Sequence, residues 1–314
     1  MIRLFRAGCF YIFVGIFLAV FCPSLKAQTS SQVSVDPEMQ FRERLNSEVT
    51  EDKSEESFHQ EIDSYARHMP YTSLKSQEGK LSILDSGSQY SYEFKTFEKL
   101  GIQLFLDSQY INIEGSSPVI LPAHLTGLSA GVETTLPFFK FDNTYFRVRV
   151  MPAYYSDDWD FHSSAFRIPV HSFMIYQPNE KWTFIGGIAV YPDFETPVFP
   201  ILGFIYKPND LWTFNLIPER PYISYRLNDK ITLFTEGGFS SEEFEVKKDN
   251  FEGAVLSYNE IHFAGGLEYQ LNKNIKASVS SGYMFDRYFK YRDSLGKVTL
   301  KNNIYSELKV EMSL

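Results

Sequence analysis

The feature that most constrains this chain is a seven-residue pattern that recurs along it: an aromatic residue, a short polar stretch and a second large apolar residue. Asn-Asp, Asn-Glu or Asn-Lys pairs occupy the middle of four copies. Asparagine adopts the left-handed and Asx-turn conformations that reverse a chain within few residues. The pattern therefore predicts six tight hairpins, at Phe94–Leu100, Phe139–Tyr145, Tyr176–Trp182, Tyr206–Trp212, Tyr225–Ile231 and Tyr269–Ile275.

Apolar and polar residues alternate with a period of two from about Lys80 onward, for example over residues 100–107 and 261–270. This period is typical of strands with one apolar and one polar face. Two segments, RIPVHSFMIYQ and VFPILGFIYK, are apolar on both faces. A strand of that kind must meet packed side chains on its inner side, so we expect the interior beside these two segments to be filled.

The connections between the predicted hairpins are longer, more variable and more polar than the hairpin turns themselves. Short turns at one rim and long loops at the other are typical of an antiparallel, up-and-down transmembrane β-barrel. Aromatic side chains level with the short turns fit an interfacial girdle, because their rings prefer the boundary between apolar and wet surroundings. The girdle candidates are Tyr176, Trp182, Tyr206, Trp212, Tyr225 and Tyr269.

Three regions follow from composition. Residues 1–27 combine an early basic pair with an apolar run that contains both cysteines, which predicts a signal peptide cleaved after Ala27. Residues 28–79 hold 11 Asp and Glu against 5 Lys and Arg, and we expect a largely disordered, acidic periplasmic extension, with room for one short amphipathic helix in FHQEIDSYARHM. Residues 80–314 form the predicted barrel.

The signal peptide, the hairpin series and an amphipathic last segment, YSELKVEMSL, resemble bacterial outer-membrane β-barrel proteins over about residues 80–314. In detail the chain is similar to an uncharacterised outer-membrane barrel family of unknown function. Six hairpins, the last segment and a short KLSILD strand predict about 14 strands. Twelve is the alternative, because two strands around PERP have only about seven residues against the ~9–11 that span a bilayer, and the two could merge into one bent rim.

The same alternation assigns a charged set of side chains to the barrel interior. A mixture of both signs there requires either a hydrated channel or an internal salt-bridge network, since buried charges without water or partners are costly. In the channel interpretation, Arg147 and Arg149 meet carboxylates and form a field that selects small polar solutes. The lumen-facing candidates are Glu93, Lys95, Gln103, Asp107, Arg147, Arg149, Glu236, His262, Glu268, Lys276 and Glu311.

No sequence motif indicates catalysis, a cofactor or a metal site. The sequence lacks a G-x-S-x-G elbow, an H-E-x-x-H helix and a P-loop, and we interpret the proximity of His262 and Glu260 as a by-product of alternation. The formal charge of −9 and the absence of a basic stripe disfavour nucleic-acid binding.

The sequence therefore predicts an outer-membrane β-barrel that acts as a passive channel or uptake component for small polar solutes, or as a non-enzymatic structural membrane protein. The expected partners are outer-membrane lipids, the barrel-assembly machinery and those solutes. Two alternatives remain open: a barrel-embedded lipid-modifying hydrolase, whose site would leave no local motif, and a soluble secreted β-barrel that binds an apolar ligand.

Overall fold

The computed structural model describes residues 59–96, 100–138, 141–158, 165–192, 197–218, 221–246, 253–292 and 296–314, without the side chains of residues 95 and 96. The predicted signal peptide and residues 28–58 of the predicted extension lie outside this part of the chain. No helix within the described residues is long and apolar enough to cross a membrane.

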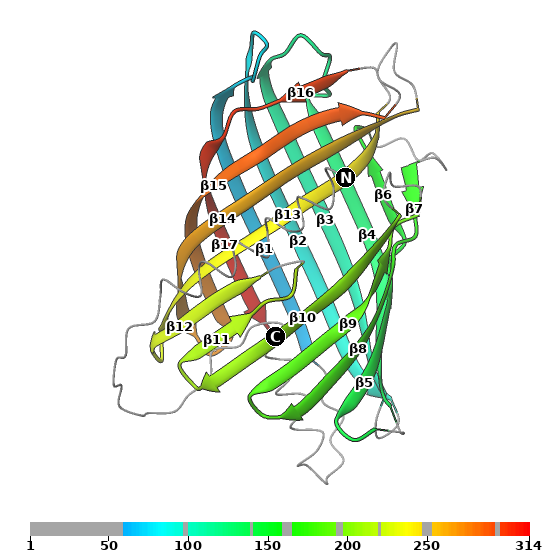
Figure 1. Cartoon of the computed structure of the whole chain (residues 1–314), viewed down its shortest axis with the longest axis vertical. Coiled ribbons are helices and arrows are strands. Elements are labelled where there is room, and N and C mark those ends of the chain that lie inside the picture. Colours follow the sequence, from blue (N-terminus) through cyan, green and yellow to red (C-terminus); the bar gives the residue numbers. More distant parts are fainter. Residues whose placement is uncertain are drawn as a thin grey trace. The chain divides into compact units, whose positions relative to one another are not determined.

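The described chain is all β. Its strands are β1 (His59–Ser73), β2 (Lys80–Thr96), β3 (Leu100–Ser116), β4 (His124–Pro137), β5 (Thr144–Val150), β6 (Ala153–Ser156), β7 (Phe166–Arg167), β8 (Val170–Asn179), β9 (Trp182–Val190), β10 (Val198–Asn209), β11 (Trp212–Asn215), β12 (Tyr222–Asn228), β13 (Ile231–Val246), β14 (Ala254–Asn272), β15 (Ile275–Tyr291), β16 (Lys297–Thr299) and β17 (Asn303–Ser313) (Figure 1).

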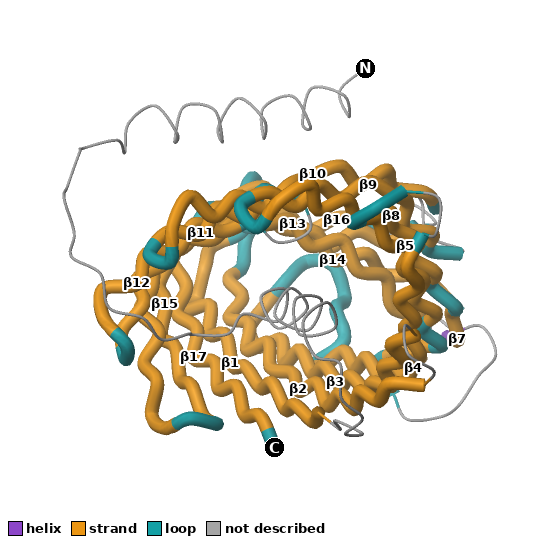
Figure 2. Tube along the Cα trace, turned by 90° about the horizontal axis from the view of Figure 1, so that it is seen from below, coloured by secondary structure: helices purple, strands orange, loops and turns teal. Residues whose placement is uncertain are grey.

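These strands close into a ring (Figure 2). The last strand, β17, pairs antiparallel with β15 on one side and with β1 on the other, so the predicted closing strand is confirmed. Three short strands continue longer ones after a break: β6 follows β5, β7 precedes β8, and β16 precedes β17. The 17 strands therefore build a closed, antiparallel, 14-stranded barrel, the predicted fold and the favoured strand number.

Three of the six predicted tight turns show why asparagine recurs in them, while those at Phe94–Leu100 and Phe139–Tyr145 lie partly outside the described structure. Asn179 accepts hydrogen bonds at Oδ1 from the backbone N–H groups of Lys181 and Trp182, at 2.9 and 3.2 Å. Asn209 and Asn228 make the same pair of bonds in the next two hairpins. Each asparagine thus satisfies backbone donors that the turn leaves without a strand partner, which explains why the motif repeats.

The predicted start of the barrel at Lys80 is wrong, and residues 59–69 form a strand in place of the short helix that FHQEIDSYARHM would have allowed. Residues from His59 onward form strand β1, which pairs with β2 from His59↔Glu93 to Ser73↔Lys80. The KLSILD segment is the first part of β2 rather than a strand of its own. Pairing on both sides overrides the polar composition of β1, whose Arg67 is ion-paired with Glu307 of β17.

The wall of the barrel is uneven in height. β13, β14 and β15 have 16, 19 and 17 residues, whereas β11 and β12 have 4 and 7. The two strands around PERP are therefore short, as predicted, and they remain separate. Figure 1 shows the long strands running obliquely past the short ones. At its far end β13 pairs in parallel with β6, through Glu245↔Ser156.

Outward side chains alternate with inward ones along the long strands. The exposed large apolar residues of the long strands include Leu104, Leu106, Leu128, Val132, Leu233, Phe239, Val279, Tyr283, Ile304 and Leu308. Buried apolar residues form two separate clusters on the other parity. The barrel thus has an apolar outer belt and an interior that is packed in two places.

Candidate functional site

An ion-paired arginine of β1 lies in the barrel interior. Arg67 of β1 donates from Nε to Oε2 of Glu307 at 2.6 Å and from Nη1 to Oε1 of Glu260 at 3.0 Å. The side chains of Arg67 and Glu260 are 15% and 1% exposed. β15 and β17 stand between β14, which carries Glu260, and β1 in the ring, so this contact runs through the interior rather than along the wall.

A second contact crosses the interior from another direction. Gln109 of β3 donates from its side-chain amide to Asp85 at 3.3 Å and to Glu242 of β13 at 3.2 Å. Tyr65 donates its hydroxyl to the same Asp85 oxygen at 3.1 Å. We call Tyr65, Arg67, Asp85, Gln109, Glu242, Glu260 and Glu307 the inner polar network. It contains four carboxyl groups and one guanidinium, so it favours cationic or hydrogen-bond-donating groups over anions.

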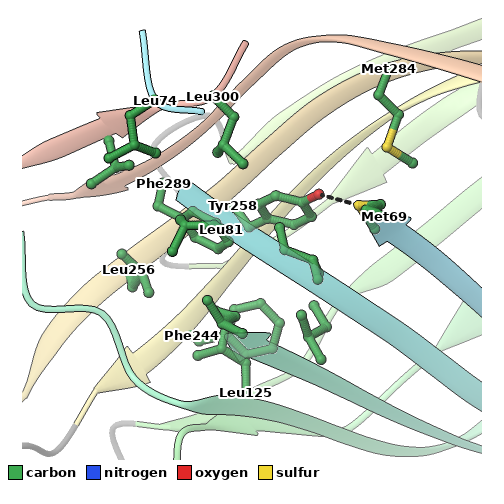
Figure 3. Packing of buried hydrophobic residues seen from close by; sticks show 14 of the residues in the cluster. Met69, Leu74, Leu81, Leu125, Phe244, Leu256, Tyr258, Met284, Phe289 and Leu300 are labelled. Carbon is green, nitrogen blue, oxygen red and sulfur yellow. Dashed lines mark hydrogen bonds between the residues drawn. The ribbon is translucent and has the colours of Figure 1, made fainter. Parts of the chain in front are cut away.

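Nineteen buried apolar or aromatic residues fill the interior toward the end of the barrel that carries the long loops. Phe244 of β13, Leu256 of β14 and Ile111 of β3 are each 0% exposed, although β3 is not adjacent to either of the other two strands. Figure 3 shows side chains of this group, which we call the apolar plug, gathered between several strands. Facing walls therefore pack against each other here.

Tyr258 joins the apolar plug to the inner polar network. Its hydroxyl donates to Oε2 of Glu260 at 2.5 Å and lies 3.7 Å from Sδ of Met69, the contact drawn in Figure 3. Its ring stacks on Phe289 with centroids 4.7 Å apart. The boundary between the polar and the apolar layer of the interior thus runs through one tyrosine.

The predicted arginine pair does meet a carboxylate. Arg149 Nε lies 2.7 Å from Oε2 of Glu133, and Arg147 Nε lies 3.2 Å from Oε1 of the same residue. Asp107 of β3, two strands from the arginines of β5, accepts a hydrogen bond from Ser129 at 3.0 Å. Glu133 was not among the sequence candidates, although it shares the inward parity of β4 with Ser129.

The remaining candidates are spread around the wall instead of converging on one point. Lys276 Nζ lies 3.6 Å from Oε2 of Glu311, and His262 Nδ1 lies 3.4 Å from Oε1 of Glu260. The strand register sets Glu93 beside Gln103, Glu268 beside Ser278 and Glu236 beside Ala264, while the side chain of Lys95 lies outside the described structure. That these side chains line a solute path stays a prediction.

The girdle candidates on the short-turn rim form an outward row of rings. Trp182 and Tyr206 stack with centroids 4.2 Å apart, and Trp212 and Tyr225 lie 4.7 Å apart. Tyr176 continues the row through Phe184, while Tyr269 is an exposed residue of β14. Five of the six rings therefore form one band over β8–β12, where the wall is lowest.

The segments predicted to be apolar on both faces do border a packed part of the interior. The second apolar cluster consists of side chains that are 1–7% exposed: Ile201 and Ile205 of β10, Ala189 of β9 and Ile217 of the β11–β12 loop. Phe173 of β8 packs against them. The prediction of a filled interior beside these strands is confirmed.

Sequence reasoning missed most of the inner polar network. Arg67 lies in the segment predicted to be a disordered extension. Its inward position could not be predicted without knowing that this segment forms strand β1. Glu242, Glu260 and Glu307 share the parity of predicted candidates on the same strands, and that signal was available. The partner of each group across the interior was not, because it depends on how the ring is folded.

The described residues contain no group of three or more His, Asp and Glu side chains that could hold a metal ion. Two loop segments with several carboxylates, SDDWDFHSS and VYPDFETP, lie partly outside the described structure. The contact between His262 and Glu260 is real, yet Glu260 is also held by Arg67 and Tyr258. The absence of catalytic activity stays a prediction.

Comparison with known proteins gives a family and distant structural likenesses. Residues 103–314 match a family described as a domain of unknown function (DUF6268). No curated protein matches the chain in sequence. Similar solved structures include an outer membrane channel from Pseudomonas putida F1, with 9% identity, a TM-score of 0.45, and 84% of this chain and 97% of that chain covered. A Pseudomonas aeruginosa FadL homologue has 8% identity, a TM-score of 0.44, and coverages of 82% and 89%.

Proposed function

The chain belongs to the DUF6268 family, whose function is unknown, and from its own geometry we propose that it is an outer-membrane uptake channel for small amphipathic solutes. The observation that carries this proposal is the combination of a closed strand ring, an apolar outer belt and an interior with one polar and two apolar regions. Export by the predicted signal peptide and handling by the barrel-assembly machinery remain predictions.

The outer belt supports a position in a bilayer. Helices and closed barrels are the structures that span hydrocarbon, because they pair their backbone groups internally, and the described strands form a closed ring. Its belt carries Leu104, Val279 and Leu308 at 45–56% exposure. In water, a contiguous belt of this kind would be a large exposed apolar surface, which soluble monomers rarely present.

The interior supports a solute with both polar and apolar parts. The inner polar network offers carboxylates and one amide donor, as expected for polar solutes. The apolar plug and the second apolar cluster offer only hydrocarbon and aromatic surface. A purely polar solute, the class predicted from the sequence, would match the network alone.

In this proposed channel the axial path is closed by the apolar plug. The apolar plug leaves Phe244 and Leu256 fully buried, so ions should not pass along the barrel axis. Planar-bilayer recordings of the folded protein should show little conductance. The double variant Phe244→Ala, Leu256→Ala should raise conductance several-fold, whereas Leu308→Ala on the outer belt should leave it unchanged.

Fractionation of cells and a comparison of heated and unheated gel mobility provide the control for folding. A folded barrel in the membrane fraction migrates differently before and after heating. A soluble pool with unchanged mobility would support the soluble-barrel alternative. A folded, membrane-bound double variant that never conducts would instead support a structural protein and overturn the channel proposal.

A further inference from the structure

Two long strands, β10 and β13, are incompletely paired. Each has one edge along which a partner strand covers only part of its length. β10 pairs with β9 from Val198 to Tyr206, but it pairs with β11 only at Ile205, Tyr206 and Asn209. β13 pairs with β14 along its whole length, but with β12 only from Ile231 to Glu236. Among the described residues, no strand lies between the remaining halves of β10 and β13.

The backbone groups on these two edges can be identified residue by residue. Phe204 accepts a hydrogen bond from Leu216 N on the β11 side, so Val198 and Leu202, which share its parity, direct their backbone groups to the same edge. Gly237 donates to Pro221 O, so Phe239 and Ser241 direct theirs to the facing edge. No described strand pairs with these groups on that edge.

Pro200 indicates from the sequence that this edge of β10 has no partner strand. It lies within β10 on the parity of Leu202, where its missing N–H would otherwise leave a gap in a strand ladder. Proline inside a sheet is confined to edges and bulges for this reason. Its presence in the middle of a 12-residue strand fits an edge without a partner.

Hydrogen-bonded segments of the polypeptide close the gap between β10 and β13 at both of its ends. At the end beside the short strands, the two hydrogen bonds of Leu216 and Pro221 join the β11–β12 loop to β10 and β13, at 2.9 Å each. Above, Asp157 N donates to Glu245 O at 3.2 Å, which ties β13 to β6. Residues 238–244 of β13 lie between these ties, and at about 3.3 Å per residue they span roughly 20 Å along the strand.

The surfaces beside the gap are apolar on both sides of the wall. Outside, Leu202 is 68% exposed, Val198 50% and Phe239 45%. Inside, the second apolar cluster places Ile201 and Ile217 next to the edge of β10. The axial exit, in contrast, is filled by the apolar plug. Unpaired backbone groups are costly in hydrocarbon, so water or polar groups must reach these edges from the interior.

We propose that the gap between β10 and β13 is a lateral opening through which a molecule with an apolar chain and a polar head passes between the barrel interior and the bilayer. This inference rests on the proposed membrane channel and names its route and solute class. The apolar chain of this molecule slides over the second apolar cluster, and its polar head remains with the inner polar network.

Amide hydrogen exchange on the full mature chain, folded in phospholipid nanodiscs, tests the opening itself. The amides of Leu202, Phe239 and Ser241 should exchange about 100-fold faster or more than that of Leu106, which lies in β3 between two partner strands. Protection of all three to the level of Leu106 would mean that the edges are covered, and would overturn the proposal.

Photolabelling tests the passage. A fatty acid with a diazirine in its chain, and separately a phospholipid with the same group, are added to the nanodiscs, and adducts are mapped by mass spectrometry. We expect adducts on Ile201 and Ile217 as well as on the outer belt, with Ile217→Asn reducing the inner adducts several-fold and Leu308→Asn leaving them unchanged. Inner adducts from only one probe would identify a free amphiphile or a membrane lipid as the occupant. Adducts confined to the belt with both probes would overturn the proposal.

Spin labels separate this inference from the proposed function. Both cysteines of the chain lie within residues 1–27, so single cysteines can be introduced into the barrel. Labels at Val279 and Leu104 should collide with oxygen in the bilayer and not with a water-soluble nickel complex, whereas labels at Leu202 and Phe239 should collide with both. Aqueous behaviour at Val279 and Leu104 would contradict the membrane channel, and purely lipidic behaviour at Leu202 and Phe239 would contradict only the opening.

Discussion

Replacement of Arg67 by alanine tests the inner polar network and strand β1 together. Arg67 holds Glu260 and Glu307 at 3.0 and 2.6 Å, and both carboxylates are almost fully buried, at 1% and 7% exposure. Removal of one partner from a buried ion pair costs about 3–5 kcal/mol, because the other charge stays buried without compensation. Arg67 is itself 15% exposed, and water can enter the space it leaves, so we expect about 3 kcal/mol, the lower end of that range.

The measurement is urea unfolding of the folded protein in phospholipid vesicles, followed by tryptophan fluorescence. Arg67→Lys is the matched control: it keeps the charge but loses the planar fork, and should cost only about 1 kcal/mol. The double variant Arg67→Ala, Glu260→Gln should be more stable than Arg67→Ala alone, since it removes one of the two orphaned charges. A loss below about 1 kcal/mol for Arg67→Ala, or an additive loss in the double variant, would refute the reasoning.

Three further perturbations test other layers of the structure by the same unfolding assay. Val279→Arg places a charge on the outer belt and should cost about 2–4 kcal/mol near the bilayer midplane, whereas inward Ser278→Arg should be tolerated; equal effects would show that the facing of β15 is misassigned. Asn209→Ala removes the acceptor of two backbone N–H groups at a tight turn and should cost about 1 kcal/mol, and no change in the unfolding midpoint would mean that the motif is not structural. Gly131→Ala places a methyl group 2.3 Å from the Phe105 ring and 2.5 Å from a backbone oxygen, so a loss of about 1–3 kcal/mol is expected, and a neutral result would show that the wall can yield there.

The uneven wall gives these predictions a common setting. Long strands on one side of the ring pack against each other through the apolar plug, and short strands on the other side leave the edges of β10 and β13 without a strand between them. Closure along the axis and opening through the side are therefore two consequences of one difference in strand length.

The sequence by itself determined the local features of this protein. Asparagine turns, period-two alternation and the aromatic residues beside the turns are read from neighbours a few positions apart, and the structure contains these turns, the inward and outward parities and the 14-stranded ring. Even the short strands around PERP were recognisable, because their length is a local property.

Only the tertiary structure decided what crosses the interior. The partners of Arg67 lie 193 and 240 positions away in the chain, and nothing in the residues beside it indicates either one. β1 itself escaped prediction because its polar composition becomes compatible with a strand only when β17 and β2 supply partners on both sides. The gap between β10 and β13 likewise exists only once the ring has closed, since an edge lacks a partner by virtue of where all the other strands end.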